Sequence, residues 1–335
     1  MRCPTIAELP PPPSGKSGWP WTIETPPLPE RLPDGSVWPL ISIVTPSYNR
    51  EEFLEETIRS VLLQGYPELE FFIIDGGSTD HSVEVIRKYE KWLTQWISEK
   101  DRGEYHAINK GLPLCHGEII TFHNSDDYYL SGAFGDAAIR WSQDKGCGVI
   151  AGAFYYVDGD KMRDRPVPPA LPQTGPIDLV ITQEPWRLHQ VALFFTRHAL
   201  DTVGRKVSEE FEYNGDREML YRICRQFRTV LSQKPYAAFR WHTDGKSISN
   251  MFQADMDYAN LHLSYHYDDP EKERLKWLVA NRRRAKGYHR FARMHGATPE
   301  SVWAVVKAPY YDSRLLGKPS YYGTWLRALG LRSGR

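Results

Sequence analysis

Short apolar runs alternate with amphipathic stretches over the first third of the chain. Four of the runs have the length and apolar character of short buried strands: 40–45, 69–74, 96–98 and 118–123. Three stretches between them repeat apolar residues at the spacing of a helix that buries one face: 51–63, 81–92 and 105–112. Strands and helices that alternate in this way predict an α/β fold with a mostly parallel, doubly wound sheet.

The rest of the chain is less regular and ends in helices. Its apolar runs predict three further strands, at 149–157, 191–195 and 236–241. The stretch at 217–227 is amphipathic and predicts a helix. Beyond Asn250 the pattern predicts helices only: 251–264, 270–294, 299–307 and a shorter one at 320–328.

Proline sets the N-terminal segment apart. Residues 1–39 hold 11 of the 25 prolines, so this segment is expected to be extended rather than helical. Trp19, Trp21 and Trp38 indicate that it lies on the surface of the fold. We therefore predict a Pro-rich arm at 1–39, a sheet domain at 40–245 with halves at 40–127 and 128–245, and a helical extension at 246–335.

Composition excludes several classes of protein. With 335 residues, 41% hydrophobic and 25% charged, the chain is neither disordered nor collagen-like. No apolar run approaches the ~20 residues that span a bilayer, and the N-terminus lacks the apolar core of a signal peptide. Four cysteines lie far apart, without a Cys-x-x-Cys pair. We expect reduced thiols and a cytoplasmic protein, with contact at the inner face of the membrane left open.

The net charge of zero hides an uneven distribution. Residues 271–335 hold 15 Lys and Arg against 4 Asp and Glu, which leaves 27 against 38 for residues 1–270. The basic part could meet phosphates, an anionic membrane or nucleic acid, and a solvated helical surface explains the same charges. Arg282, Arg283, Arg284 and Lys286, with Trp277 and Tyr288, are the candidates for membrane contact. A plain helical subdomain, or a dimer surface, is the alternative.

Polar clusters follow the predicted strands, where ligands bind to sheets of this kind. At 124–127 two adjacent carboxylates follow an apolar strand, and Mg²⁺ or Mn²⁺ take one or two such ligands together with substrate phosphates. A turn that caps a helix near Ser131 explains the same residues.

A second cluster, at 75–80, combines a carboxylate with two glycines. Asp75 could read a base or a ribose hydroxyl, while the glycines let backbone amides approach a ligand; a tight strand-to-helix turn is the alternative. Tyr48 offers a ring on which a base could stack, or packs in a turn.

Five motifs occur in one order: IVTPSYNR at 43–50, SVLLQ at 60–64, EFFIIDGGSTD at 70–80, AINKG at 107–111, and the stretch 117–127. Together they resemble the family-2 glycosyltransferases, which have the GT-A nucleotide-diphospho-sugar-binding fold. The resemblance covers about 40–245. It implies an enzyme that moves a sugar from a nucleotide-diphospho-sugar to an acceptor hydroxyl with Mn²⁺ or Mg²⁺, in the synthesis of surface polysaccharide or another glycan.

The resemblance also assigns residues on the donor side. Those expected to bind the donor are Pro46, Tyr48, Asn49, Asp75, Lys110, Asn124, Ser125 and Asp126. Asn124-Ser125-Asp126 aligns with the Asp-x-Asp motif of the family, so Asp126 is expected to ligate the metal, Asp127 to support it and His242 to contact metal or diphosphate. The chain departs from the family at two positions. Asn124 is neutral, and Gly76 stands where many members have a second Asp. The resemblance therefore does not indicate which nucleobase the donor carries.

On the acceptor side the resemblance assigns Asp216 as the catalytic base, and helix capping is the alternative. His189 and Gln190 resemble an element that shapes the acceptor pocket, although a histidine of the core explains His189 equally well. Arg102 or Lys110 could offset diphosphate charge. The expected acceptor is a glycan or a lipid-linked glycan, and no nucleic-acid partner is expected.

With a single base, the expected reaction is one displacement that inverts the anomeric carbon. A nucleotidylyltransferase has a similar sheet, but the residues after Thr45 lack the glycines and lysine that hold a triphosphate. A sugar-nucleotide-binding scaffold without activity is the third reading, and the intact Asp126, Asp127 and Asp216 argue against it.

Overall fold

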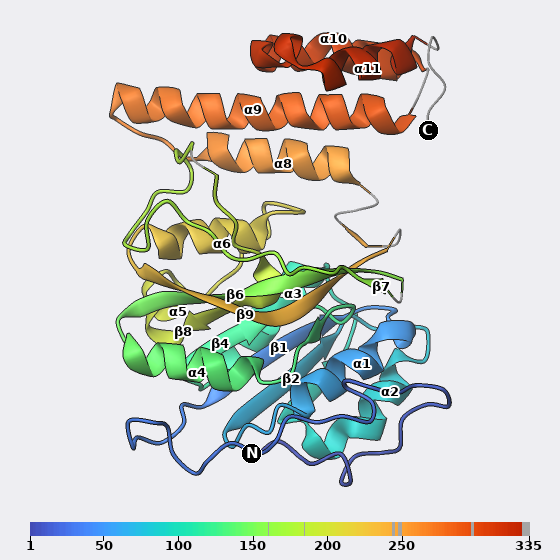
Figure 1. Ribbon diagram of the computed structural model, residues 1–335, viewed down its shortest axis with the longest axis vertical. Helices are drawn as coiled ribbons and strands as arrows, with labels where there is room; N and C mark the ends of the chain where they lie inside the picture. Colours follow the sequence, from blue (N-terminus) through green and yellow to red (C-terminus); the bar gives the residue numbers. More distant parts are fainter. Residues whose placement is uncertain (160, 184, 243–244, 247–249, 296–297, 330–335) are drawn as a thin grey trace. The chain divides into compact units, whose positions relative to one another are not determined.

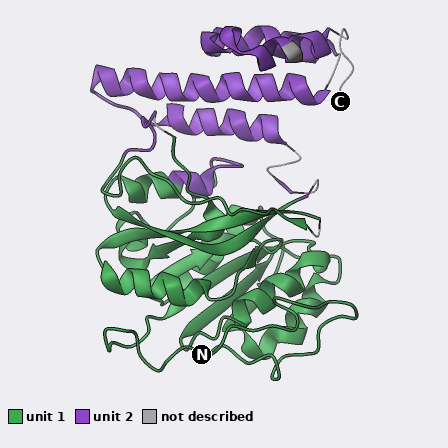
Figure 2. Cartoon of the chain, in the orientation of Figure 1, with its two compact units in different colours: residues 1–177, 185–209, 219–241 green, residues 178–184, 210–218, 242–335 purple. Residues whose placement is uncertain are grey.

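The computed structural model describes residues 1–159, 161–183, 185–242, 245–246, 250–295 and 298–329 (Figure 1). The chain forms two compact units, coloured separately in Figure 2. The first comprises 1–177, 185–209 and 219–241, and the second comprises 178–184, 210–218 and 242–335. Two short internal segments therefore group with the C-terminal residues.

A mixed sheet forms the centre of the first unit. Over the described residues it has nine strands in the order β3-β2-β1-β4-β8-β6-β9-β5, with β7 paired to β6. β1 pairs in parallel with β2 and β4, β2 with β3, and β6 with β9, whereas β8 runs antiparallel to both β4 and β6. The strands are β1 Ile41–Ser47, β2 Leu69–Asp75, β3 Gln95–Ser98, β4 Ile119–Phe122, β5 Tyr128–Tyr129, β6 Cys147–Asp158, β7 Lys161–Met162, β8 Leu193–Thr196 and β9 Arg228–Trp241.

Helices cover this sheet. α3 packs on β1 and β2, α4 on β6 and β9, and α5 on β6 and β8. Every residue of β1 is buried, as expected for a strand with neighbours on both sides and helices over its faces. The helices are α1 Glu51–Leu62, α2 Ser82–Tyr89, α3 Glu104–Gly111, α4 Ala133–Gln143, α5 Arg197–Thr202 and α6 Gly215–Cys224.

The N-terminal segment packs on the first unit through a buried arginine. The guanidinium of Arg59, on α1, donates to the carbonyl oxygens of Pro10 at 2.8 Å, Pro20 at 3.1 Å and Trp21 at 2.9 Å. Trp19 donates its indole N–H to the carbonyl of Tyr129 at 2.7 Å. The segment is therefore part of the packed surface of the unit, as its tryptophans predicted.

The C-terminal helices form a core of their own. α9 (Pro270–His295) packs against α8 (Met251–Ser264), α10 (Pro299–Tyr311) and α11 (Pro319–Ala328). Ala285, Ala292, Ala304 and Val305 are at the centre of this core. Over the described residues, none of the helices combines the length and the apolar character needed to cross a membrane.

The fold class predicted from the sequence is confirmed, and so are most elements. α8 has the predicted bounds, and α9 extends one residue beyond them. Other predictions fell short: β9 begins at Arg228 rather than at Tyr236, α6 covers Gly215–Cys224 rather than 217–227, and α10 continues to Tyr311 rather than ending at 307. α4 was foreseen only as an alternative reading of the turn before it, and α5 was not predicted.

Candidate functional site

The polar clusters at 75–80 and 124–127 and the residues that follow β1 meet at one edge of the sheet. Ser47 at the end of β1 lies opposite Asp75 at the end of β2, and Asp75 lies opposite Ser98 on β3. On the other side of β1, Val44 pairs with Phe122, the last residue of β4. Because these strands are parallel, the segments that follow β1, β2 and β4 leave the sheet at the same edge.

Asp75 is buried and holds the turn after β2 in place. Its Oδ2 accepts hydrogen bonds from the backbone N–H groups of Gly77 at 3.0 Å and Ser78 at 2.9 Å, and from Ser98 Oγ at 2.7 Å. Its Oδ1 accepts one from Ser78 Oγ. The carboxylate thus has a structural role, and its predicted contact with the nucleoside stays a prediction.

Asn49 joins the loop after β1 to that turn. Its Oδ1 accepts a hydrogen bond from Thr79 N–H at 2.9 Å, and its own N–H donates to Ser78 Oγ at 2.8 Å. Its φ of 50° lies in the left-handed region, which asparagine tolerates better than most residues. Pro46 is buried in β1, whereas Tyr48 is 58% exposed. Tyr48 therefore presents a ring to solvent beside the clusters.

The position of Gly76 explains one departure from the family pattern. A Cβ atom at Gly76 would lie 3.0 Å from the carboxylate of Asp101, closer than most real contacts of that kind. Asp101 also accepts a hydrogen bond from Gly103 N–H at 2.8 Å. The space in which a second carboxylate would begin is thus taken by the carboxylate of Asp101, a residue 25 positions further along the chain.

Asp126 and Asp127 are neighbours in sequence with different surroundings. The carboxylate of Asp126 is 17% exposed and lies 3.4 Å from Arg50 Nε. Asp127 is buried, and its Oδ1 accepts a hydrogen bond from Arg240 N–H at 2.8 Å. Burial and the adjacent Asp126 raise the pKa of Asp127 well above its usual value. Of the two, Asp126 is the one accessible to a cation.

Arg240, on β9, holds this turn in place, and it was not among the site residues predicted from the sequence. Its guanidinium donates to the carbonyl oxygen of Asp126 and to Glu56 Oε2, the latter at 2.9 Å. It lies over the ring of Phe53 at 4.7 Å and that of Tyr128 at 5.2 Å. A charged residue in an apolar strand was the available signal, because a buried cation needs partners of this kind.

Polar atoms at this edge also remain without partners. Among the described residues, Thr45 Oγ1, Ser47 Oγ and Asn124 Oδ1 are buried and have no hydrogen-bond partner. Buried polar atoms are rarely left without a partner, and the binding of a ligand, an ion or a water molecule is a common reason. The orphaned atoms belong to β1 and to the turn after β4, where a ligand was predicted.

The same atoms allow a test of the predicted metal. Within the described ranges, no group of three or more His, Cys, Asp or Glu side chains could hold a metal ion. Mg²⁺ and Mn²⁺ commonly take one or two protein carboxylates and complete their shell with phosphate oxygens and water. One accessible carboxylate, Asp126, with a neutral oxygen of Asn124 on the same turn, fits a metal shared with a diphosphate.

The acceptor-side residues are linked to the end of β4. Gln190 Nε2 donates to the carbonyl of Phe122, and the ring of His189 lies between those of Phe154 and Phe239, at 4.4 and 4.7 Å. Their predicted role in acceptor binding is not tested by these contacts.

His123 is buried at the end of β4, and burial lowers its pKa to about 3. The two cations that were predicted to offset diphosphate charge each have a carboxylate partner. Lys110 pairs with Glu99 at 2.9 Å, and Arg102 pairs with Glu209 at the same distance.

Asp216 and His242 belong to the second unit. Asp216 lies in the first turn of α6, and it is partly exposed. The predicted joint action of Asp126 and Asp216 on one substrate stays a prediction, as does the contact of His242 with metal or diphosphate.

Comparison with known proteins gives a consistent family. The profile of the family described as "Glycosyl transferase family 2" matches residues 42–204. A putative teichuronic acid biosynthesis glycosyltransferase, TuaG of Bacillus subtilis (strain 168), is 35% identical over 111 residues, which are 32% of this chain and 39% of that protein. The match thus covers about two fifths of the length of this relative.

Solved structures resemble the chain over more of its length. The crystal structure of S. aureus TarS 1-349 in complex with UDP-GlcNAc has a TM-score of 0.56 and 18% identity, and the match covers 87% of this chain and 89% of that one. The mannosyltransferase PcManGT from Pyrobaculum calidifontis, in complex with GDP-Man and Mn²⁺, has a TM-score of 0.55, 15% identity and 88% coverage of each chain. At these identities the likeness concerns the fold.

Proposed function

The chain belongs to glycosyl transferase family 2, and from this premise we propose that it transfers a sugar from a nucleotide-diphospho-sugar to the hydroxyl group of an acceptor. Three of the similar proteins support the proposal: TuaG is named for teichuronic acid biosynthesis, TarS is in complex with UDP-GlcNAc, and PcManGT is in complex with GDP-Man and Mn²⁺. We propose a glycan or lipid-linked glycan of the cell surface as the acceptor.

One observation carries this proposal: the partly exposed carboxylate of Asp126 lies in the turn after β4, at an edge of the sheet where buried polar atoms have no hydrogen-bond partner among the described residues. Ser47 Oγ and Asn124 Oδ1 can bind the polar groups of a nucleotide. The exposed ring of Tyr48 can stack on the base. The set comprises an aromatic face, neutral hydrogen-bonding groups and one available carboxylate, and these suit a nucleoside diphosphate.

A divalent cation is the proposed cofactor, and when bound it would neutralise charge that builds on the departing diphosphate. Asp126 would hold it. Arg240 positions that residue through its carbonyl oxygen. Thr57 Oγ1 fixes the same turn, because it donates to the carbonyl oxygen of Asp127 at 2.6 Å and lies 3.0 Å from that of Ser125. Lys110 is proposed to bind the donor, His242 the metal or diphosphate, and His189 and Gln190 the acceptor.

We propose Asp216 as the general base. Its carboxylate would take the proton from the acceptor hydroxyl as that oxygen attacks the anomeric carbon. The bond from this carbon to the diphosphate breaks at the same time, and the nucleoside diphosphate leaves with the bonding electrons. A single displacement inverts the anomeric configuration, which proton NMR of the new linkage would report.

The sharpest test compares Asp126→Asn with Asp216→Asn. Donors with different nucleotides and sugars are supplied with Mn²⁺ or Mg²⁺, and release of nucleoside diphosphate is measured. Asp216→Asn is expected to lower turnover by about 10²–10⁴-fold and to bind donor as the wild type does, because only the proton acceptor is lost. Asp126→Asn is expected to weaken the binding of donor and metal together, because the amide is a poorer ligand than the carboxylate.

Glu212→Gln is the matched control, since Glu212 is an exposed carboxylate four positions before Asp216. Near-wild-type turnover in Asp216→Asn would remove the base from the proposal. Donor binding without any release of nucleoside diphosphate by the wild type would instead indicate a binding scaffold.

A further inference from the structure

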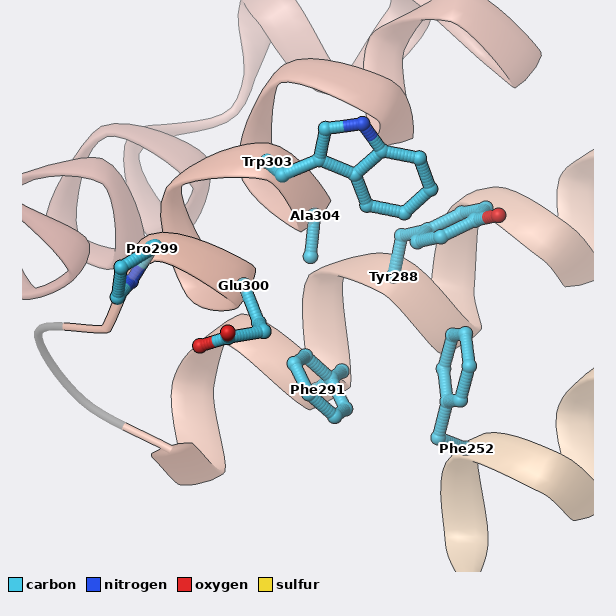
Figure 3. A pocket seen from close by; sticks show the side chains of 7 residues that line it. All are labelled: Phe252, Tyr288, Phe291, Pro299, Glu300, Trp303 and Ala304. Carbon is cyan, nitrogen blue, oxygen red and sulfur yellow. The ribbon is translucent and has the colours of Figure 1, made fainter.

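A pocket of about 450 Å³ opens among the C-terminal helices, far in sequence from the polar clusters of the sheet (Figure 3). Its volume is within the range of about 300–1,000 Å³ that is usual for sites of small ligands. All of its lining residues belong to the second unit: Phe252 on α8, Tyr288 and Phe291 on α9, and Pro299, Glu300, Trp303 and Ala304 on α10.

The lining is aromatic and almost entirely without charge. The ring of Phe252 lies 5.3 Å from that of Tyr288 and 5.1 Å from that of Phe291, and Tyr288 lies 5.3 Å from Trp303. Figure 3 shows these rings around a common space, with the carboxylate of Glu300 pointing away from them. The interior of the pocket therefore favours an apolar occupant.

A hydrocarbon chain fits this lining better than a sugar. A sugar ring can stack on an aromatic face, but each hydroxyl that it buries needs a hydrogen-bond partner. The lining side chains offer only the hydroxyl of Tyr288, the indole N–H of Trp303 and the carboxylate of Glu300. A hydrocarbon chain makes no such demand, and it gains free energy from each apolar surface it covers.

The pocket opens beside an exposed stripe on α10. Trp303, Val306 and Tyr310 are spaced three and four positions apart, so they share one side of the helix, and they are 52%, 58% and 80% exposed. Lys307 Nζ lies 5.3 Å from the ring of Trp303 and 5.6 Å from that of Tyr310. Aromatic rings with a cation among them are typical of helices that lie at the surface of a membrane.

A second cation lies one ring away from the pocket. Arg284 lies over the ring of Tyr311 at 5.6 Å, and this ring stacks on that of Tyr288, also at 5.6 Å. By contrast, Arg283 pairs with Asp255 at 3.5 Å and lies over the ring of Tyr258. Arg284 is thus placed near the pocket, whereas Arg283 contributes to the packing of α8 on α9.

We propose that this pocket binds the hydrocarbon chain of an anionic membrane lipid, with the headgroup held by Lys307 and Arg284 and the exposed side of α10 resting on the leaflet. Charge complementarity supports this occupant, since residues 271–335 hold 15 basic against 4 acidic residues. The proposal concerns attachment to a membrane and is independent of the transfer reaction.

The experiment uses the full chain and vesicles of phosphatidylcholine, with or without about a third of phosphatidylglycerol. The protein is expected to co-sediment with the anionic vesicles at low ionic strength. This binding should weaken as added salt screens the headgroups, and binding to neutral vesicles should be much poorer. Bromine atoms on the acyl chains are expected to quench tryptophan fluorescence, because the indole of Trp303 would lie beside the bound chain.

Trp303→Ala and Trp241→Ala form a control pair, because both tryptophans are exposed, at 52% and 37%, but of the two only Trp303 lines the pocket. Trp303→Ala is expected to weaken binding to anionic vesicles by about tenfold and to remove most of the quenching, whereas Trp241→Ala should bind within about twofold of the wild type. Lys307→Gln should weaken binding and its salt dependence, while Lys272→Gln, at an exposed lysine of α9, should do neither.

Circular dichroism of each variant verifies that the helices are intact. Three results would each overturn the proposal: no binding to anionic vesicles at low ionic strength, equal loss in the two tryptophan variants, or equal binding to neutral and anionic vesicles. Displacement of the protein from vesicles by a soluble maltooligosaccharide would show instead that the pocket takes a glycan.

Discussion

His262 is a buried histidine of α8 whose Nδ1 lies 2.7 Å from the carbonyl oxygen of Val180. Burial lowers its pKa to about 4, because the imidazolium form would lose its hydration. In the unfolded chain a histidine titrates near ~6.5. The contribution of His262 to stability is therefore complete above that pH and is lost as the pH falls toward 4, since the unfolded chain binds the proton first.

We expect His262→Asn to reduce this dependence on pH. Between pH ~6.5 and ~4 the free energy of unfolding should fall less in the variant than in the wild type, by up to about 3 kcal/mol over the interval. Urea unfolding followed by circular dichroism at a series of pH values measures the difference. His266→Asn is the control, since the side chain of His266 is 81% exposed. A fall as steep in His262→Asn as in the wild type would contradict the assigned cause.

The surroundings of single residues in the candidate site were only partly predictable from the sequence. Sequence position alone predicted that Asp75 and Asp126 follow strands at one edge of the sheet, and the structure confirms that placement. It could not distinguish their surroundings, because some of the decisive partners come from distant residues. Asp75 is held by Ser98, 23 residues away, and Asp127 by Arg240, 113 residues away. Nothing local in the sequence encodes such contacts.

At the scale of elements, the N-terminal segment depends on Arg59. Its guanidinium is fully buried and supplies the donors for three carbonyl groups of that segment, and it also donates to Tyr89 Oη at 3.1 Å. The ring of Trp21 lies 5.5 Å from the same guanidinium. A proline-rich chain has few backbone donors of its own, so a single side chain with five N–H groups can anchor it.

Arg59→Met is expected to destabilise the first unit by at least about 3 kcal/mol, because removal of the donors leaves buried carbonyl groups unpaired, at about 1–3 kcal/mol each. The free energy of unfolding in urea measures the loss, and limited proteolysis should then cut within residues 1–39 first. Arg87→Met, at an exposed arginine of α2, is the control and should change stability by less than about 0.5 kcal/mol. Equal stability of the two variants would refute the anchoring role.

Element boundaries were predictable where the local signals are strong. α9 begins at Pro270 as predicted, because proline is favoured in the first turn of a helix. β9 was predicted only from Tyr236, and the residue before it, Pro235, has no N–H to donate in the interior of a sheet. The strand accommodates this proline at a position where its register with β6 shifts, Ala153 opposite Pro235 and Phe154 opposite Ala237. That irregularity depends on the partner strand, which the pattern does not reveal.

At the scale of the whole molecule, the four cysteines report on the integrity of the first unit. All are free, buried and assigned to that unit: Cys3, Cys115, Cys147 and Cys224. Burial raises the pKa of each thiol to about 12. Because the thiolate is the reactive form, none of the four is expected to react while the unit is folded.

Ellman's reagent at about pH 8 should therefore leave the native protein unmodified, and all four thiols should react once urea unfolds it. The midpoint of thiol reactivity should coincide with loss of the sheet by circular dichroism. A thiol that reacts in the native protein would contradict the burial of that cysteine.

The fold class followed from the sequence because the alternation of strand and helix is a property of the chain itself. The grouping of distant segments did not. Residues 210–218, which hold Asp216, join the C-terminal helices through contacts such as that of Tyr213 N–H with Asp257 Oδ2, 44 residues apart. Neither charge nor periodicity in this segment indicates that partner.

The two ends of the sheet also bear on how the protein behaves in concentrated solution. β3 has four residues and β5 has two, so the outermost strands offer little backbone for intermolecular strand addition. β9 is longer, but over the described residues β5 pairs with it only at Ala237 and Ala238, and Lys234 and Pro235 precede that stretch. A charged residue and a proline on such an edge oppose the pairing of further chains. The sheet should thus resist growing into aggregates at either end.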